Sequence, residues 1–393
     1  MSSPLSPARP RVWPLYVGGF LGPFGGAVTN TMLPELAHGL GTDLTAASSA
    51  VTWYMLPFCL ALLVSGSLAQ RWGRGRTIRG GYAVYLAASL VCVLAQGLPA
   101  GAVVPVFMAG RALQGVGNAF TTPVLVSLLS EFVPGDRLGR SLGLFASMQA
   151  AGQAFSPLVG GVAADTDYRF AFVVTGLAAL VLGLVTPSGR AGSGRAGGPT
   201  DWRALANPRV AQSSAVAFAA QVSATGVTVL AALIATDRFG LSPTTRGLVV
   251  AFYGVAGLAS GNLAGRLADS WGIRRLGVLS LLVLAVAMAL VGLAPWLALL
   301  VVLVGAIGAA GTASRILTNT LALRSTPQNT GGATSVTMAV QFLGSAVVPA
   351  LLPLYAIAPA LATAAAGAVA ALGAVVAAVP VRPAADDGAV RRS

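Results

Sequence analysis

The sequence predicts an all-α membrane protein in which twelve transmembrane helices form two pseudo-symmetric six-helix bundles. Two observations predict this fold. Of the 393 residues, 55% are hydrophobic and 9% are charged, against roughly 25% charged residues in a soluble domain, so lipid must surround most of the chain. The stretch 66–76, GSLAQRWGRGR, returns at 265–275 as GRLADSWGIRR, with six of eleven positions identical. A basic turn repeated half a chain apart indicates two equivalent halves.

The first half divides into six spans, because a helix needs about 20 apolar residues to cross about 30 Å of hydrocarbon. The charge-free run 80–110 is too short for two spans and a turn, and the letters LPAG at 98–101 break it. The fourth helix must therefore continue through Arg111 to about residue 130, which places Arg111 inside the membrane. The other expected spans of this half are 12–34, 44–70, 141–164 and 170–189.

The second half repeats this pattern after a Gly- and Arg-rich stretch that we interpret as a flexible linker. Residues 210–236 and 247–265 supply its first two spans. The run 276–314 holds two helices split at Pro295, and the second of them must run past Arg315. The uncharged run 325–381 holds two more, broken between Pro353 and Pro359. The expected domains are a bundle at 1–187, a cytoplasmic linker at 188–208, a bundle at 209–381 and a cytoplasmic tail at 382–393.

The basic residues set the expected orientation. All 24 are arginines, and 19 of them fall on the side of the N-terminus, whereas Arg169, Arg238 and Arg246 fall in the loops of the other side. An excess of arginine in short loops marks the cytoplasmic side, so both termini and the linker are expected there. The net charge of +13 is then a topology signal, and no nucleic-acid partner is expected.

The repeated turn carries a family resemblance. It resembles the G-x-L-A-D-R-x-G-R-R signature of the major facilitator superfamily, and the 6 + 6 plan extends the likeness over essentially the whole chain. The acid of the signature is Gln70 here, whereas the second copy keeps Asp269. The resemblance implies a cytoplasmic latch between helices, formed by Gly66, Arg71, Gly73 and Arg76 in one half and by Gly265, Asp269, Gly272 and Arg275 in the other.

The fifth helix carries a second signature, which resembles the antiporter motif G-x8-G-x3-G-P-x2-G-G. Small residues let two helices approach closely, and proline interrupts helical hydrogen bonding, so we expect a tightly packed seam that can rock. In the family this motif is typical of exporters. The matching residues are Gly143, Gly152, Ser156, Pro157, Gly160 and Gly161, with serine in place of one glycine.

Further resemblances concern the coupling ion. Arg111 with Gln114 resembles the family motif in which an intramembrane arginine lies near the coupling-ion route. Residues 30–34 resemble the N-x-x-L-P ending of drug–proton antiporters, many of which carry an aspartate five residues earlier, where this chain has Gly25. An acid or histidine in the first outer loop could titrate from outside, although a solvated loop residue is the simpler interpretation. The coupling candidates are Arg111, Glu35 and His38.

Polar side chains inside the spans predict a central cavity, because each is costly in contact with lipid. We expect its lining to include Asn30, Trp53, Tyr54, Arg111, Gln114, Asn118, Gln149, Gln153, Gln221, Tyr253 and Gln341. Asn262 is expected to point inward as well. Amides and aromatic rings with almost no acids favour a neutral or amphipathic substrate over a polyvalent cation. Arg315, nearer the cytoplasmic end, is expected to be structural and to snorkel.

The expected function is secondary active transport by a monomer in the cytoplasmic membrane of a bacterium. It would export small amphipathic or drug-like molecules by alternating access, in exchange for protons. The alternatives are a specific metabolite exporter or importer, and a transport-dead sensor or assembly protein with the same fold. An enzyme is not expected, because His38 is the only histidine and no nucleophile motif is present. No cofactor and no metal site are expected, and the fold does not fix the substrate.

Overall fold

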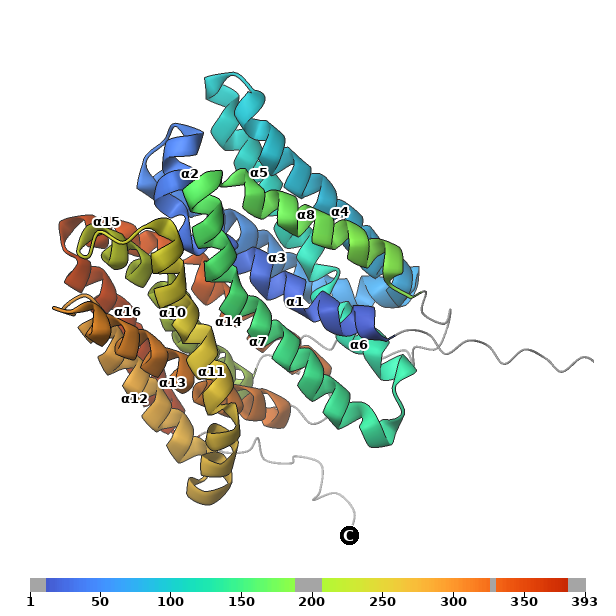
Figure 1. Ribbon diagram of the computed structural model, residues 1–393. Coiled ribbons are helices and arrows are strands. Elements are labelled where there is room, and N and C mark those ends of the chain that lie inside the picture. Colours follow the sequence, from blue (N-terminus) through green and yellow to red (C-terminus); the bar gives the residue numbers. More distant parts are fainter. Residues whose placement is uncertain (1–11, 188–206, 326–329, 381–393) are drawn as a thin grey trace, which may run out of the picture.

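The computed structural model describes residues 12–187, 207–325 and 330–380, and the regular elements in these ranges are helices (Figure 1). The first half contains α1 (Trp13–Ala27), η1 (Val28–Thr31), α2 (Leu33–Leu40), α3 (Leu44–Trp72), α4 (Arg74–Leu94), η2 (Ala95–Gly97), α5 (Ala100–Ala119), α6 (Thr122–Phe132), α7 (Gly135–Thr166) and α8 (Arg169–Val185). The second half contains α10 (Pro208–Asp237), α11 (Pro243–Trp271), α12 (Ile273–Val291), α13 (Leu297–Ser325), α14 (Thr330–Ala346), η4 (Val348–Leu351), α15 (Leu352–Ile357) and α16 (Pro359–Ala378).

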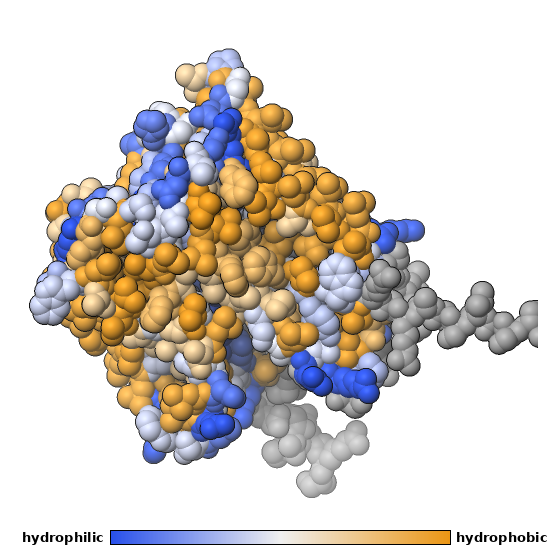
Figure 2. Space-filling model, in the orientation of Figure 1, coloured by the Kyte–Doolittle hydropathy of each residue, from blue (hydrophilic) through white to orange (hydrophobic). Residues whose placement is uncertain are grey.

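Nine segments of the described chain are long and apolar enough to cross a membrane. The three other predicted spans are helical too: α1 continues into η1 and α2, α7 has 32 residues and α8 has 17. Leu60, Leu184 and Leu372 are each more than 60% exposed, and Figure 2 shows apolar side chains over much of the visible surface of both halves. Such a surface suits lipid, and the predicted all-α membrane fold is confirmed.

The first span departs from its predicted limit at residue 34. After the short η1, Pro34 stands in the first turn of a further helix, α2, a position that proline favours. This helix ends at the left-handed cap Gly41 and packs against α3. Glu35 and His38 therefore lie on a helix, and the prediction that they belong to a loop is wrong.

The repeated turns join equivalent helices in the two halves. Gly73 stands between α3 and α4, and Gly272 stands between α11 and α12. Their φ angles are 89° and 87°, a region that residues with a side chain avoid. The two repeated turns therefore share their backbone conformation as well as their sequence. We call the end of the molecule that carries these two turns the linker end, and the opposite end, with α2 and the start of α11, the outer end.

An arginine ties the third helix of each half to the end of the sixth. Arg79 of α4 donates to the carbonyl oxygen of Thr186 at 2.9 Å, and Arg274 of α12 donates to that of Ala377 at 2.9 Å. Between the halves, α7 packs against α11 and α3 against α14. Smaller contacts join η1 of the first half to α10 and α11 of the second, so a relative movement of the halves must change all of these contacts.

Candidate functional site

A cavity lies between the two bundles and takes its walls from both. Helices α1, α3, α5, α6 and α7 line one side, and α10, α11 and α14 line the other. Its apolar lining includes Met55, Phe58, Leu62, Met338 and Phe342, and no acid occurs among the described residues that line it. The structure brings seven of the predicted polar residues into this lining: Asn30, Tyr54, Asn118, Gln149, Gln153, Gln221 and Tyr253.

Hydrogen bonds fix part of this polar lining. The Nδ2 atom of Asn30 donates to Thr228 Oγ1 at 2.9 Å and so joins the two halves inside the cavity. Gln221 donates to Ser345 Oγ at 3.0 Å and accepts from Gln341 Nε2 at 3.0 Å. Gln341 itself lies in a small recess beside the cavity. The threonine and the serine were missed from sequence, because hydroxyl groups inside helices usually bond their own backbone.

Three predicted cavity residues lie elsewhere. Trp53 is 51% exposed and belongs to a lipid-facing stripe of α3 with Leu56 and Leu60, because it is one position out of phase with Tyr54 on the helix. Arg111 and Gln114 are buried inside the first bundle. The expectation that these three line the cavity is wrong. Asn262, which was expected to point inward, is exposed on α11.

Arg111 is held by neutral groups. Its guanidinium donates to the carbonyl oxygens of Ala50 and Gly25, both at 3.3 Å, and to Gln114 Oε1 at 2.7 Å. It also lies 4.4 Å from the centre of the Tyr54 ring, an arrangement that stabilises a cation. Because Tyr54 lines the cavity and Arg111 does not, the arginine supports the cavity wall from behind.

Gly25 shows why this chain has no acid at that position. A Cβ atom there would collide with the hydroxyl group of Tyr85, whose fully buried side chain fills the space between α1 and α4. The carbonyl group of Gly25 meanwhile accepts from Arg111. An aspartate would require Tyr85 to move, so the carboxylate typical of the resembling antiporters has no room here.

Arg111→Gln is expected to lower the thermal stability of the purified protein. The substitution removes the donor to four acceptors, the three named above and Thr29 Oγ1 at 3.5 Å, a loss of about 1–3 kcal/mol. Arg111→Lys should recover only part of it, since an ammonium group cannot reach acceptors in three directions as a guanidinium does. The melting temperature in detergent measures the effect. An unchanged melting temperature in Arg111→Gln, with transport lost, would instead give Arg111 a direct role in transport.

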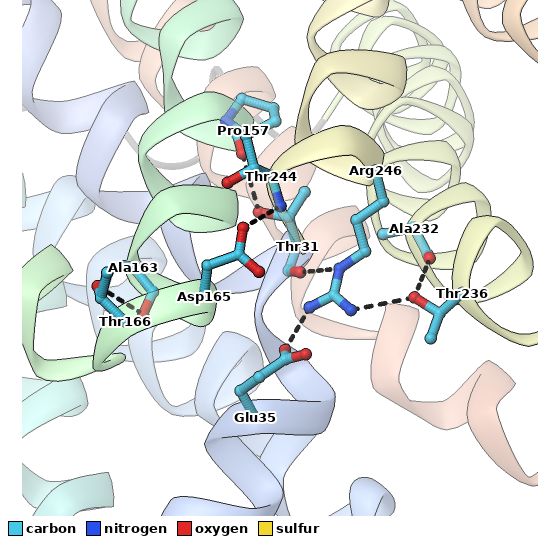
Figure 3. A network of polar contacts seen from close by, with 10 residues as sticks. All are labelled: Thr31, Glu35, Pro157, Ala163, Asp165, Thr166, Ala232, Thr236, Thr244 and Arg246. Atoms are coloured by element: carbon cyan, nitrogen blue, oxygen red, sulfur yellow. Dashed lines mark hydrogen bonds and ion pairs between the residues drawn. The ribbon is translucent and has the colours of Figure 1, made fainter. Parts of the chain in front are cut away.

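At the outer end, an ion pair joins the two halves (Figure 3). Arg246, in the first turn of α11, is 1% exposed and pairs with Glu35 of α2. Its Nε atom donates to the carbonyl oxygen of Thr31 at 2.8 Å, and its Nη1 atom donates to Thr236 Oγ1 at 3.0 Å. We call this set of contacts around Arg246 the outer latch.

The outer latch corrects two interpretations made from sequence. Arg246 is not a loop residue, and Glu35 is not simply solvated, because the two halves bury the arginine between them. The available signal was an arginine at the start of an apolar run on the side where arginines are rare. His38, the other predicted coupling candidate of α2, is exposed and lies outside the latch.

Two further acids lie near the outer end. Asp165 of α7 accepts from the backbone N–H of Thr244 at 2.9 Å, again across the halves. Asp167 accepts from Arg169 Nε at 2.7 Å, and this hydrogen bond holds the pKa of the Asp167 carboxyl below its usual value. The side chains of Asp167 and Arg169 are about 40% exposed, so their pair adds little stability.

Glycines of the second signature let α7 pack closely on α1 of its own half and on α11 of the other half. Gly152 packs on the backbone of Phe20 in α1, within its own half. Gly161 packs on α11 of the other half, where an added Cβ atom would lie 2.6 Å from the carbonyl oxygen of Pro243. Pro157 presents its carbonyl oxygen to Gly247 at the same contact. The outer part of α7 is thus a seam between the halves that admits no larger side chain.

Among the described residues, the linker end is open. Three glycines of the signatures have no atom within 4 Å that an added Cβ atom would meet: Gly66, Gly143 and Gly265. The charged residues expected to form a latch at this end are exposed: Arg71, Arg76, Asp269 and Arg275. Figure 2 shows a hollow between the halves on this side. The described part of the molecule is therefore closed at the outer end and open at the linker end, one of the two states that alternating access requires.

Two six-helix bundles around a central cavity that is closed at one end define a secondary transporter. The sequence matches the profile of the Major Facilitator Superfamily over residues 15–221 and 213–392, and the chain belongs to this family. It is therefore a multi-pass membrane transporter and not an enzyme.

Curated relatives match part of the chain. The tetracenomycin C resistance and export protein of Streptomyces glaucescens is 29% identical over 47% of this chain and 34% of its own length. The methylenomycin A resistance protein of Bacillus subtilis is 32% identical over 34% of this chain and 28% of its own length. The drug efflux pump JefA of Mycobacterium tuberculosis is 30% identical over 37% of this chain and 28% of its own length. The match to this chain thus spans about a third or less of the length of these relatives.

Solved structures match the whole fold. A D-xylose–proton symporter superposes with a TM-score of 0.75 at 17% identity, covering 94% of this chain and 97% of its own. A transporter of the POT family superposes with a TM-score of 0.73 at 13% identity, covering 93% of this chain and 94% of its own. At such low identity the likeness establishes the fold alone.

Proposed function

We propose that this protein exports small amphipathic or drug-like molecules from a bacterial cell in exchange for protons. The observation that carries the proposal is the similarity to proteins described as resistance, export and drug efflux proteins. In this proposal a single chain transports, and both termini and the linker lie in the cytoplasm. The open end of the cavity then faces the compartment from which an exporter takes its substrate.

The chemistry of the cavity supports an amphipathic substrate. Phe58 and Phe342 meet edge to face across the halves, with ring centres 5.1 Å apart, and offer an apolar surface. Gln149 and Gln153 of α7 line the same cavity and have no hydrogen-bond partner among the described residues, so both amides are available to a ligand. Apolar walls with a few well-placed polar groups are typical of sites for small molecules.

Dye accumulation in bacterial cells that lack their main efflux pumps tests the proposal. Cells that produce the protein should accumulate less of an amphipathic dye than control cells, and an uncoupler should abolish the difference. Equal accumulation over several dyes, with the protein shown to be in the membrane, would contradict multidrug export. A difference that survives the uncoupler would contradict proton exchange.

Two variants make this test specific to the cavity. Gln149→Ala is expected to weaken export several-fold, because a lost hydrogen bond inside the membrane contributes about 1 kcal/mol. Trp53→Ala changes a larger side chain on the lipid-facing side of α3 and should leave export near the wild-type level. If both variants export alike at equal membrane levels, Gln149 does not contact the substrate.

A further inference from the structure

The fourth spanning helix of each half carries an arginine well inside it, Arg111 in α5 and Arg315 in α13, and the two have opposite surroundings. Arg111 of α5 is fully buried and donates to neutral acceptors on three sides. Arg315 of α13 is half-buried, and none of the described residues forms a hydrogen bond or an ion pair with it. The first arginine is committed to the packing of its bundle, whereas the second is free to bind something else.

Arg315 lies at the edge of the central cavity. It lines a recess of about 280 Å³ together with Gln153, Tyr253 and Thr312, which come from α7, α11 and α13. Gln153 and Tyr253 also line the central cavity, so the recess and the cavity share a wall. A second, smaller recess brings Arg315 beside Gln341. The sequence analysis did not predict that Arg315 lies beside the cavity.

The charge of Arg315 has no counterpart nearby. The described residues that line the cavity and its two recesses include no aspartate or glutamate. Arg315 stands ten positions before Ser325, the last residue of α13, or about 15 Å along the axis at 1.5 Å per residue, so it is well inside the helix. A cation in such a place normally has a partner or serves function.

We propose that Arg315 binds an anionic group of the transported molecule, a carboxylate or a phenolate. A guanidinium group donates two parallel hydrogen bonds to a carboxylate. The amides and aromatic rings of the cavity would hold the remainder of the molecule. The central cavity encloses about 90 Å³, less than the 300–1,000 Å³ of ordinary ligand sites, so the adjoining recess at Arg315 supplies room that a substrate requires. This inference rests on the proposed function and narrows its substrates to amphipathic acids.

A reactive cysteine in the shared wall tests the charge without any substrate. Gln153→Cys would be labelled in purified protein with a sulfonate-bearing and with a trimethylammonium-bearing methanethiosulfonate. The native Cys59 and Cys92 are buried, and the unsubstituted protein gives their background. The labelling rate with the anionic reagent is divided by the labelling rate with the cationic reagent. We expect this ratio to fall roughly tenfold when Arg315→Gln is added, as the loss of a nearby unit charge predicts. An unchanged ratio would overturn the proposal.

A matched pair of ligands tests the substrate class. 2-Naphthoate and 2-naphthamide have the same ring system and differ in charge. Naphthoate should slow the labelling of the Gln153→Cys variant more than naphthamide does when Arg315 is present, and this preference should vanish when Arg315→Gln is added. Equal protection by the two compounds, or none by either, would overturn the assignment of Arg315 to an anionic substrate.

Two control variants separate the charge from other effects. Arg315→Lys keeps a cation and should keep most of the preference for naphthoate. Arg324→Gln removes an arginine near the end of the same helix, outside the cavity lining, and should change nothing. The labelling requires no transport. A protein that binds naphthoate through Arg315 but fails the dye test would contradict the proposed export and leave the anion site standing.

Discussion

Glu35→Gln is expected to open the outer end of the molecule and to stop transport. The substitution leaves the guanidinium group of Arg246, which is 1% exposed, without its anion. Breaking a fully buried ion pair costs about 3–5 kcal/mol. Glu35 keeps 27% of its side chain exposed, so we take about 2 kcal/mol. The closed outer end then loses roughly thirtyfold in population relative to the open one.

Labelling of a cysteine in place of Thr31 measures this opening. Thr31 is fully buried in the closed state, and its contact with Arg246 uses the backbone carbonyl, which the substitution preserves. A membrane-impermeant maleimide should label Thr31→Cys only when Glu35→Gln is also present. His38→Gln, an exposed position on the same short helix, is the matched control and should give no labelling.

A double substitution shows whether the charge itself is responsible. Glu35→Gln combined with Arg246→Met leaves no unpaired charge at the contact, and such replacements of a buried pair are often neutral. The outer end should close again in this variant. Full transport by Glu35→Gln with Thr31→Cys still protected would contradict the latch as a determinant of the closed state.

Gly161→Val is expected to abolish transport at a normal level of protein in the membrane. Even the Cβ atom of a new side chain would lie 2.6 Å from the carbonyl oxygen of Pro243 and 3.1 Å from the Cα atom of Thr244. These are backbone atoms at the start of α11, which a side-chain rotation cannot relieve. The halves would be forced apart at the outer end, and the closed state would be lost.

Gly143→Val is the matched control, because it belongs to the same signature and the same helix but has no neighbour within 4 Å. It should leave Thr31→Cys protected, whereas Gly161→Val should expose it. The rate of maleimide labelling compares the two variants directly. Equal labelling would mean that the seam at Gly161 does not hold the outer end closed.

Much of the fold could be predicted from the sequence, because the length and depth of a span follow from local composition. The continuation of the fourth span past Arg111 and the break before Pro359 are examples, although the fourth span is divided into α5 and α6 around Phe120 and Thr121, where one continuous helix was expected. The faces of the helices were harder to predict. Trp53 and Tyr54 are adjacent, yet one meets lipid and the other lines the cavity, and hydropathy alone does not fix rotation about the helix axis.

Partners across the halves were not predictable from local patterns. Glu35 and Arg246 are 211 positions apart, and only the docking of the two halves at the outer end brings them together. The same holds for Asn30 and Thr228. Arg315 likewise has no hydrogen-bond or ion-pair partner among the described residues, which the local sequence does not reveal, whereas Arg111 is bonded on several sides within its own bundle.

In the described part of the chain the halves are packed together at the outer end and separated at the linker end, so α11 can swing about its outer end, which lies against Gly161. The helix has 29 residues, about 43 Å at 1.5 Å per residue. A swing of about 15°, the size of a known subunit rotation, would carry its far end about 11 Å. A small shift at the contact with Gly161 is therefore amplified to the width of an aromatic molecule at the other end. The angle through which α11 turns at this contact then sets how wide the linker end opens.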